Sequence, residues 1–214
     1  MRKREERFVT IPLDDGEQVL EGSFIAGPDD DAVGAVIAAP HPLYGGSMDS
    51  PVVNEIAYAA RSAELASLRF NWRGVGASAG TASGESVDAD ADYGAALCQL
   101  TQMLSGAVIA AGYSFGAAAA ARAVAGEPRV RRLLLVAPPP GMLDAAALAS
   151  FRGDVLLVAG AADSLAPAAE IERIASALSN GSFAAIPGAD HFFGAGLSEL
   201  GRITEQWFRR GAAP

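Results

Sequence analysis

The chain has 214 residues, of which 50% are hydrophobic and 19% charged, a balance that excludes an intrinsically disordered polypeptide. A chain of this length is expected to form one domain, residues 1–214, with a sizeable core. Its net charge of −9 argues against a nucleic-acid-binding protein, because phosphate groups are held by a basic face.

The ends and the cysteine content of the chain bear on its location. The basic opening Met1-Arg2-Lys3-Arg4 is followed by two glutamates and not by an apolar run, which predicts a solvated terminus rather than a signal peptide. No stretch approaches the ~20 apolar residues of a membrane helix, so we expect no membrane partner. Cys98 is the only cysteine, which excludes an intramolecular disulfide and a cysteine metal cluster. We therefore expect a cytoplasmic protein.

Short apolar runs typical of strands alternate along the chain with longer helical patterns. In chain order we predict strands at 8–13 and 18–25 joined by the turn Asp14-Asp15-Gly16, a strand at 33–39, a helix at 52–68, a strand at 68–70, a helix at 86–104, a strand at 107–111, a helix ending at 125, strands at 132–136 and 155–159, a helix at 167–178, a strand at 182–186 and a helix at 197–209. This alternation predicts the α/β class, with a mostly parallel sheet of about seven to eight strands flanked by helices.

The strand at 107–111 leads into Gly112-Tyr113-Ser114-Phe115-Gly116 and then directly into an alanine-rich helical run. Gly-x-Ser-x-Gly between a strand and a helix is typical of a nucleophile elbow, with Ser114 at its tip. The serine backbone of such an elbow is strained, and the residues two positions on either side lie close to neighbouring chain, which favours glycine there. The pentapeptide alone is a weak motif, so its context decides.

A serine hydroxyl becomes a nucleophile only when a base takes its proton and a third group orients that base. The chain holds two histidines, and His191 lies in the loop after the last predicted strand. Asp163 follows the strand at 155–159. Ser114, Asp163 and His191 therefore occur in the order of an α/β-hydrolase triad, each just past the carboxyl end of a strand, where open α/β sheets bind ligands.

Two of the three triad candidates also have a structural explanation. A histidine in a loop is often a surface or capping residue, and Asp163 is well placed to satisfy the first amides of the helix that starts near Pro167. Asp190 neighbours His191, but adjacent side chains seldom face each other. Asp154 precedes its strand and is expected at the opposite edge of the sheet. The joint order and position of the three residues favour the triad.

An oxyanion hole needs two preorganised N–H donors. One is expected to be the backbone N–H of Phe115, at the start of the elbow helix. The other is expected in His41-Pro42-Leu43, after the strand at 33–39. Because proline has no N–H, Leu43 is the natural donor and Tyr44 the alternative. His41-Pro42 also has the simpler interpretation of a tight turn.

Four segments together resemble one known family: 41–48 (HPLYGGSM), 69–78 (RFNWRGVGAS), 112–116 (GYSFG) and 188–193 (GADHFF). They are similar to the small, lidless bacterial α/β-hydrolases, which are carboxylesterase-like serine hydrolases, and the resemblance covers nearly the whole chain. It implies Ser114 as nucleophile, Asp163 as acid, His191 as base, and Leu43 and Phe115 as oxyanion donors. The sequence departs from the family after Met48, where residues 49–51 (DSP) replace the expected Asn-Lys pair.

Other motifs have structural interpretations. The segment 74–79 (GVGASA) fits a dinucleotide fingerprint but opens no helix, so we expect Arg73 to anchor it as a loop. Asp88, Asp90 and Asp92 lack the glycine and glutamate of an EF-hand and are expected at a solvated helix start. Cys98 falls within an apolar pattern and is expected in the core. Four aromatic residues flank the triad and belong either to an acyl pocket or to the core: Tyr113, Phe115, Phe192 and Phe193.

The sequence thus predicts a single-domain α/β-hydrolase fold without a lid domain, because residues 137–151, the usual site of a lid, have room for one short helix. We predict a serine hydrolase that cleaves a carboxylic ester of a small or medium substrate through an acyl-enzyme, with no cofactor and no metal. Amide hydrolysis or acyl transfer by the same triad is an alternative, as is a non-catalytic binding protein that retains the fold. The oligomeric state is left open.

Overall fold

The computed structural model describes residues 5–13, 16–30, 32–124 and 126–210. The basic opening at 1–4, the first two residues of the predicted hairpin turn (Asp14 and Asp15) and residue 125 lie outside these ranges.

Within these ranges the strands form one sheet of eight, in the spatial order β1-β2-β4-β3-β5-β6-β7-β8. The pairs β1–β2 and β2–β4 are antiparallel, and all the other pairs are parallel. The strands are β1 (Glu6–Pro12), β2 (Val19–Ile25), β3 (Gly34–Ala38), β4 (Ala66–Phe70), β5 (Val108–Tyr113), β6 (Val130–Val136), β7 (Asp154–Gly160) and β8 (Gly181–Ile186). The predicted hairpin and the mostly parallel sheet are both confirmed.

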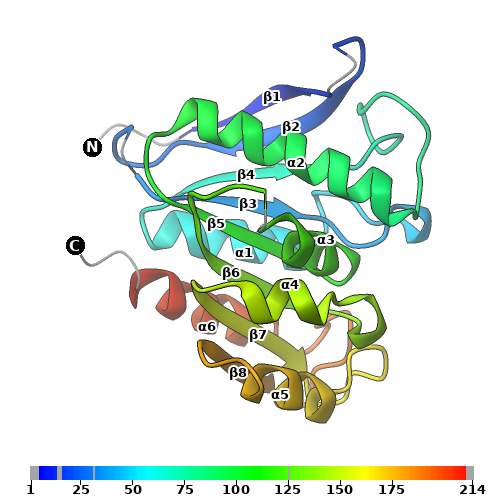
Figure 1. Cartoon of the computed structure of the whole chain (residues 1–214), viewed down its shortest axis with the longest axis vertical. Helices are drawn as coiled ribbons and strands as arrows, with labels where there is room; N and C mark the ends of the chain where they lie inside the picture. Colours follow the sequence, from blue (N-terminus) through cyan, green and yellow to red (C-terminus); the bar gives the residue numbers. More distant parts are fainter. Residues whose placement is uncertain (1–4, 14–15, 31, 125, 211–214) are drawn as a thin grey trace.

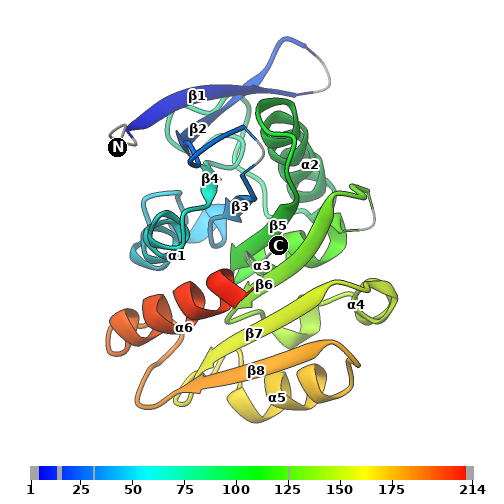
Figure 2. The same cartoon turned by 90° about the vertical axis from the view of Figure 1, so that its left-hand side faces the viewer.

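Helices cover both faces of this sheet. They are α1 (Pro51–Ser62), α2 (Ser86–Met103), α3 (Phe115–Ala123), α4 (Ala145–Ser150), α5 (Ala168–Ser176) and α6 (Leu197–Arg210), with the short 3₁₀ helices η1 (Pro42–Tyr44) and η2 (Pro140–Met142). α1 and α6 pack together on one face, and α2, α3, α4 and α5 lie on the other (Figures 1 and 2). Among the described residues, none of these helices combines the length and apolar character needed to cross a membrane.

The central strands β3 and β5 are buried along their whole length, and β6 and β7 nearly so. Such strands contact helices on both faces, which explains why their sequences are continuous apolar runs without alternation. The segment between β6 and β7 contains only η2 and α4, in agreement with the prediction of one short helix in place of a lid.

The end of α1 differs from the prediction, which extended this helix to residue 68. The helix ends at Ser62, and Glu64 takes a left-handed conformation with φ 64°. The N–H of Leu65 then donates to the carbonyl of Ala60, and that of Glu64 to Arg61, as in a Schellman motif. Glycine is the usual residue at this position, so a glutamate there gives no sequence pattern for a helix end.

Candidate active site

The turn between β5 and α3 carries Ser114 in a strained conformation, with φ 55° and ψ −118°. The two motif glycines allow this turn to pack. A Cβ on Gly112 would lie 2.2 Å from the carbonyl oxygen of Gly116, and a Cβ on Gly116 would lie 2.5 Å from that of Ala39. The expected nucleophile elbow is therefore formed for the steric reason that its sequence indicates.

The three triad candidates meet in one line of hydrogen bonds. Ser114 Oγ lies 2.9 Å from His191 Nε2, and His191 Nδ1 lies 2.8 Å from Asp163 Oδ2. An ionised carboxylate only accepts hydrogen bonds, so Nδ1 carries the proton and Nε2 is left to accept that of the serine hydroxyl. All three residues are buried, which strengthens these polar contacts.

Of the three aspartates considered for the triad, only Asp163 contacts His191 through its side chain among the described contacts. Asp163 Oδ1 accepts the N–H groups of Leu165 and Ala166, both at 2.8 Å, so this side chain orders its own loop while its second oxygen faces the imidazole. Asp190 accepts the N–H of Phe192 at 3.1 Å within its own loop. Asp154 begins β7 at the opposite edge of the sheet, as expected.

The aromatic residues around the triad divide into two groups. Tyr113, Phe115 and Phe193 are buried in the core, whereas Phe192 is 71% exposed beside the His191 ring. The Tyr113 hydroxyl also donates to the carbonyl of His191 at 2.8 Å, a contact that the sequence did not reveal. Burial, followed by the charges of Asp163 and Asp190, raises the pKa of Tyr113, so this hydroxyl stays a donor.

The backbone N–H groups of the two expected oxyanion donors, Phe115 and Leu43, lie in different surroundings. The N–H of Phe115 belongs to the first turn of α3, where amides have no partner within the helix. The N–H of Leu43 donates to His41 Nδ1 at 3.2 Å, so that this histidine caps η1. The His41 ring packs 4.7 Å from the rings of Phe115 and Tyr44. Burial lowers the pKa of His41, which favours the neutral ring that this cap requires. The role of Leu43 stays a prediction.

The arginine expected to anchor the glycine-rich loop does so. The backbone N–H of Arg73 donates to Asp92, and its guanidinium binds Asp92 and Asp88. Asp92 is therefore buried rather than solvated, and Asp90 pairs with Arg122.

The expectation that Cys98 lies in the core is wrong, because this residue is exposed. The buried stripe of α2 instead follows a helical repeat that includes Asp92: Ala89, Asp92, Tyr93, Ala96, Leu97 and Leu100. Because Asp92 lies on the buried face, a hydrophobicity pattern does not reveal this stripe.

Comparison with known proteins places this site in a family. No protein-family model matches the chain. An uncharacterized protein of Rickettsia prowazekii is 33% identical over 188 residues, which are 81% of this chain and 77% of that protein. The solved structure of an α/β serine hydrolase homologue from Coxiella burnetii is 31% identical, with a TM-score of 0.80 over 97% of both chains.

A second solved structure, an α/β serine hydrolase without lid from Xanthomonas campestris, is 28% identical, with a TM-score of 0.82 over 98% of this chain and 97% of that one. These similarities extend over the whole fold and agree with the short connection between β6 and β7. The chain belongs to the small, lidless α/β serine hydrolases.

Proposed function

We propose that this protein hydrolyses a carboxylic ester of a small or medium substrate, with Ser114 as nucleophile, His191 as general base and Asp163 as the group that orients it. The observation that carries the proposal is the hydrogen-bonded line from Ser114 Oγ through both nitrogens of His191 to Asp163 Oδ2. It supplies the nucleophile, base and orienting acid that acyl transfer requires.

In the proposed reaction, Ser114 Oγ attacks the ester carbonyl while its proton passes to His191 Nε2. The resulting oxyanion accepts hydrogen bonds from the N–H groups of Phe115 and Leu43, and the tetrahedral intermediate collapses when His191 returns its proton to the leaving alcohol. Water, activated by the same imidazole, then attacks the acyl-enzyme and releases the acid. For Leu43 to take part, its N–H must turn from His41 Nδ1 towards the oxyanion or be shared between the two acceptors.

The surroundings of Ser114 support an ester with apolar groups of modest size. Phe192 is 71% exposed beside the His191 ring. Tyr44 is 87% exposed and lies against His41, whose ring packs on Phe115 next to Ser114. Both residues offer exposed aromatic surface. No large segment lies between β6 and β7 to close over a long substrate.

Labelling and turnover test the proposal together. We expect a fluorophosphonate probe to label the folded protein at Ser114, and Ser114→Ala to lower kcat/KM for short nitrophenyl esters about 10⁴-fold or more, because the nucleophile is lost. Unchanged ester hydrolysis in Ser114→Ala would contradict the mechanism. A folded wild-type protein that resists the probe would favour a binding protein instead.

The same assays separate the related reactions. Comparison of matched ester and amide substrates, with and without an added alcohol as acceptor, distinguishes ester hydrolysis from amide hydrolysis and from acyl transfer. Faster turnover of the amide, or preferential formation of a new ester with the alcohol, would replace the proposed reaction with one of these.

A further inference from the structure

The loop between β3 and α1 carries Leu43, and its two ends are both held by residues at the carboxyl end of β4. At the first end, Trp72 Nε1 donates to the carbonyl oxygens of Ala39 and Pro40, at 3.1 Å in each case. Trp72 is buried, and its ring packs edge-on against that of Phe115 at 5.5 Å. This indole thus fixes the start of the loop relative to the elbow helix.

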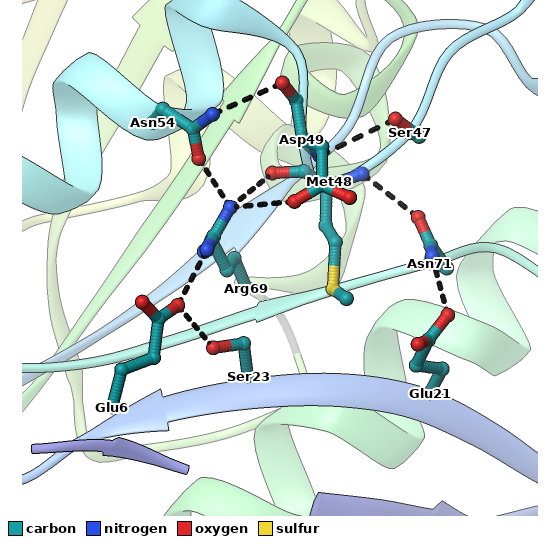
Figure 3. Close-up of polar contacts among 9 residues, drawn as sticks. All are labelled: Glu6, Glu21, Ser23, Ser47, Met48, Asp49, Asn54, Arg69 and Asn71. Carbon is teal, nitrogen blue, oxygen red and sulfur yellow. Dashed lines mark hydrogen bonds and ion pairs between the residues drawn. The ribbon is translucent and has the colours of Figure 1, made fainter. Parts of the chain in front are cut away.

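At the second end, both polar groups of the Met48 backbone are bound by side chains of the same strand end. The N–H of Met48 donates to Asn71 Oδ1 at 2.8 Å, and its carbonyl accepts from Arg69 Nη1 at 2.8 Å (Figure 3). The Met48 side chain is itself buried. Backbone groups held from both sides leave this residue little freedom to shift.

The two clamping side chains are themselves held in place. Asn71 Nδ2 donates to Glu21 Oε2 at 2.8 Å, which fixes the orientation of the amide so that its oxygen faces Met48. The Arg69 guanidinium also binds Glu6, Asp49 and Asn54, and so joins β1 to the start of α1 (Figure 3). In this cluster Arg69 and Asn71 reach Met48 directly, and Glu6, Asn54 and Glu21 hold those two side chains in place (Figure 3).

We propose that Arg69 and Asn71 are positioning residues for the oxyanion hole: by holding Met48, they fix where the loop presents the Leu43 N–H relative to Ser114. The inference rests on the proposed hydrolysis. Trp72 relates the loop to Phe115 through the same strand end, so both oxyanion donors are set by one rigid element. Placement matters because a displacement of about 1 Å costs about 10²-fold in rate.

The test is the kinetics of Arg69→Met and Asn71→Ser with a nitrophenyl ester. We expect kcat to fall about ten- to hundredfold with KM changed less than about twofold, because the oxyanion is bound only in the transition state. Arg69→Lys, which keeps a donor near the Met48 carbonyl, is expected to recover part of the loss.

Arg129→Met is a matched control. Arg129 also donates its guanidinium to two backbone carbonyls, those of Leu104 and Thr101, but at the opposite edge of the sheet. Its loss should lower the melting temperature and leave kcat within about twofold.

The outcomes separate the two proposals. An active wild type whose folded Arg69→Met and Asn71→Ser variants keep kcat would overturn the positioning role alone, as would an equal loss in Arg129→Met. A wild type without ester hydrolysis or probe labelling would overturn both. If Arg69→Met fails to fold, Asn71→Ser and Arg69→Lys decide by the same split between kcat and KM.

Discussion

The two edges of the parallel sheet are built differently. At the carboxyl edge, three residues that follow strands take positive φ without being glycine: Ser114 at 55°, Ala137 at 45° and Phe193 at 54°. Only one other non-glycine residue in the described ranges does so. A left-handed backbone costs about 1–3 kcal/mol at a residue with a side chain, so the edge that holds Ser114, Asp163 and His191 is also the strained one.

At the amino edge, arginine side chains bind backbone carbonyl groups at the C-terminal ends of helices. Arg129 donates to carbonyls at the C-terminal end of α2, and Arg132 donates to those of Trp207 and Phe208 near the end of α6. A positive charge beside the last carbonyls of a helix is favourable. The contrast indicates that contacts at the amino edge stabilise the fold, whereas the carboxyl edge holds Ser114, Asp163 and His191 together at a cost in stability.

The largest effect should come from Asp163→Asn at the carboxyl edge. The amide can still accept the N–H groups of Leu165 and Ala166 through its oxygen, so the loop should remain ordered. Its nitrogen, however, would face His191 Nδ1 and favour the tautomer that cannot accept the serine proton. We expect kcat to fall about 10⁴-fold with little change in melting temperature.

Asp190→Asn is the control for this variant. Asp190 carries the neighbouring carboxylate but bonds only the N–H of Phe192 among the contacts described for its side chain. Its kcat should stay near that of the wild type. Equal losses in the two variants would mean that negative charge, and not orientation of the imidazole, is what the site needs.

The meeting of Ser114, Asp163 and His191 could be predicted from sequence for a physical reason. Parallel strands bring all their carboxyl ends to one edge, so residues just past separate strands are close in space whatever their separation along the chain. With only two histidines to consider, Ser114, Asp163 and His191 followed from order and position. The central strands could be predicted equally well, because burial on both faces of the sheet gives an uninterrupted apolar run.

The clamp on Met48 could not be predicted in this way. Its donors and acceptors are partly backbone groups, and Arg69 and Asn71 act across 21 and 23 positions of chain. The cap of Leu43 by His41 and the bond from Tyr113 to a carbonyl are likewise side-chain-to-backbone contacts. Hydrophobic periodicity records which residues are buried, but not which backbone group a polar side chain meets.

Arg132→Met should have the next largest effect, and on stability rather than rate. The variant removes two hydrogen bonds to α6 and the contact of the guanidinium with the Trp207 ring, 3.7 Å away. Loss of charged hydrogen bonds of this kind costs about 2 kcal/mol, or about 4–8 °C in melting temperature for a domain of this size. The kcat of the folded variant should be unchanged. If kcat fell together with the melting temperature, the amino edge would not be purely structural and the comparison of the two edges would be wrong.

Tyr113→Phe should have the smallest effect and gives the finest test of the comparison. The missing hydroxyl releases the carbonyl of His191, so the imidazole should lose some of its alignment with Ser114 Oγ, and we expect kcat to fall about three- to tenfold. Because burial raises the pKa of Tyr113, the wild-type hydroxyl remains protonated, and the ratio of the two kcat values should not change with pH in the neutral range.

The matched control is Tyr93→Phe, since Tyr93 is another buried tyrosine whose hydroxyl bonds the backbone, here at Ala111 within β5. Both variants lose a buried hydroxyl, and Tyr93→Phe also leaves the N–H of Ala111 without its acceptor, so Tyr93→Phe should lose at least as much stability. Only the replacement of a tyrosine that aligns the base should lower kcat. If both variants lose stability and neither loses rate, the Tyr113 hydroxyl belongs with the structural contacts of the sheet, and the carboxyl edge owes its alignment to the line from Asp163 to Ser114 alone.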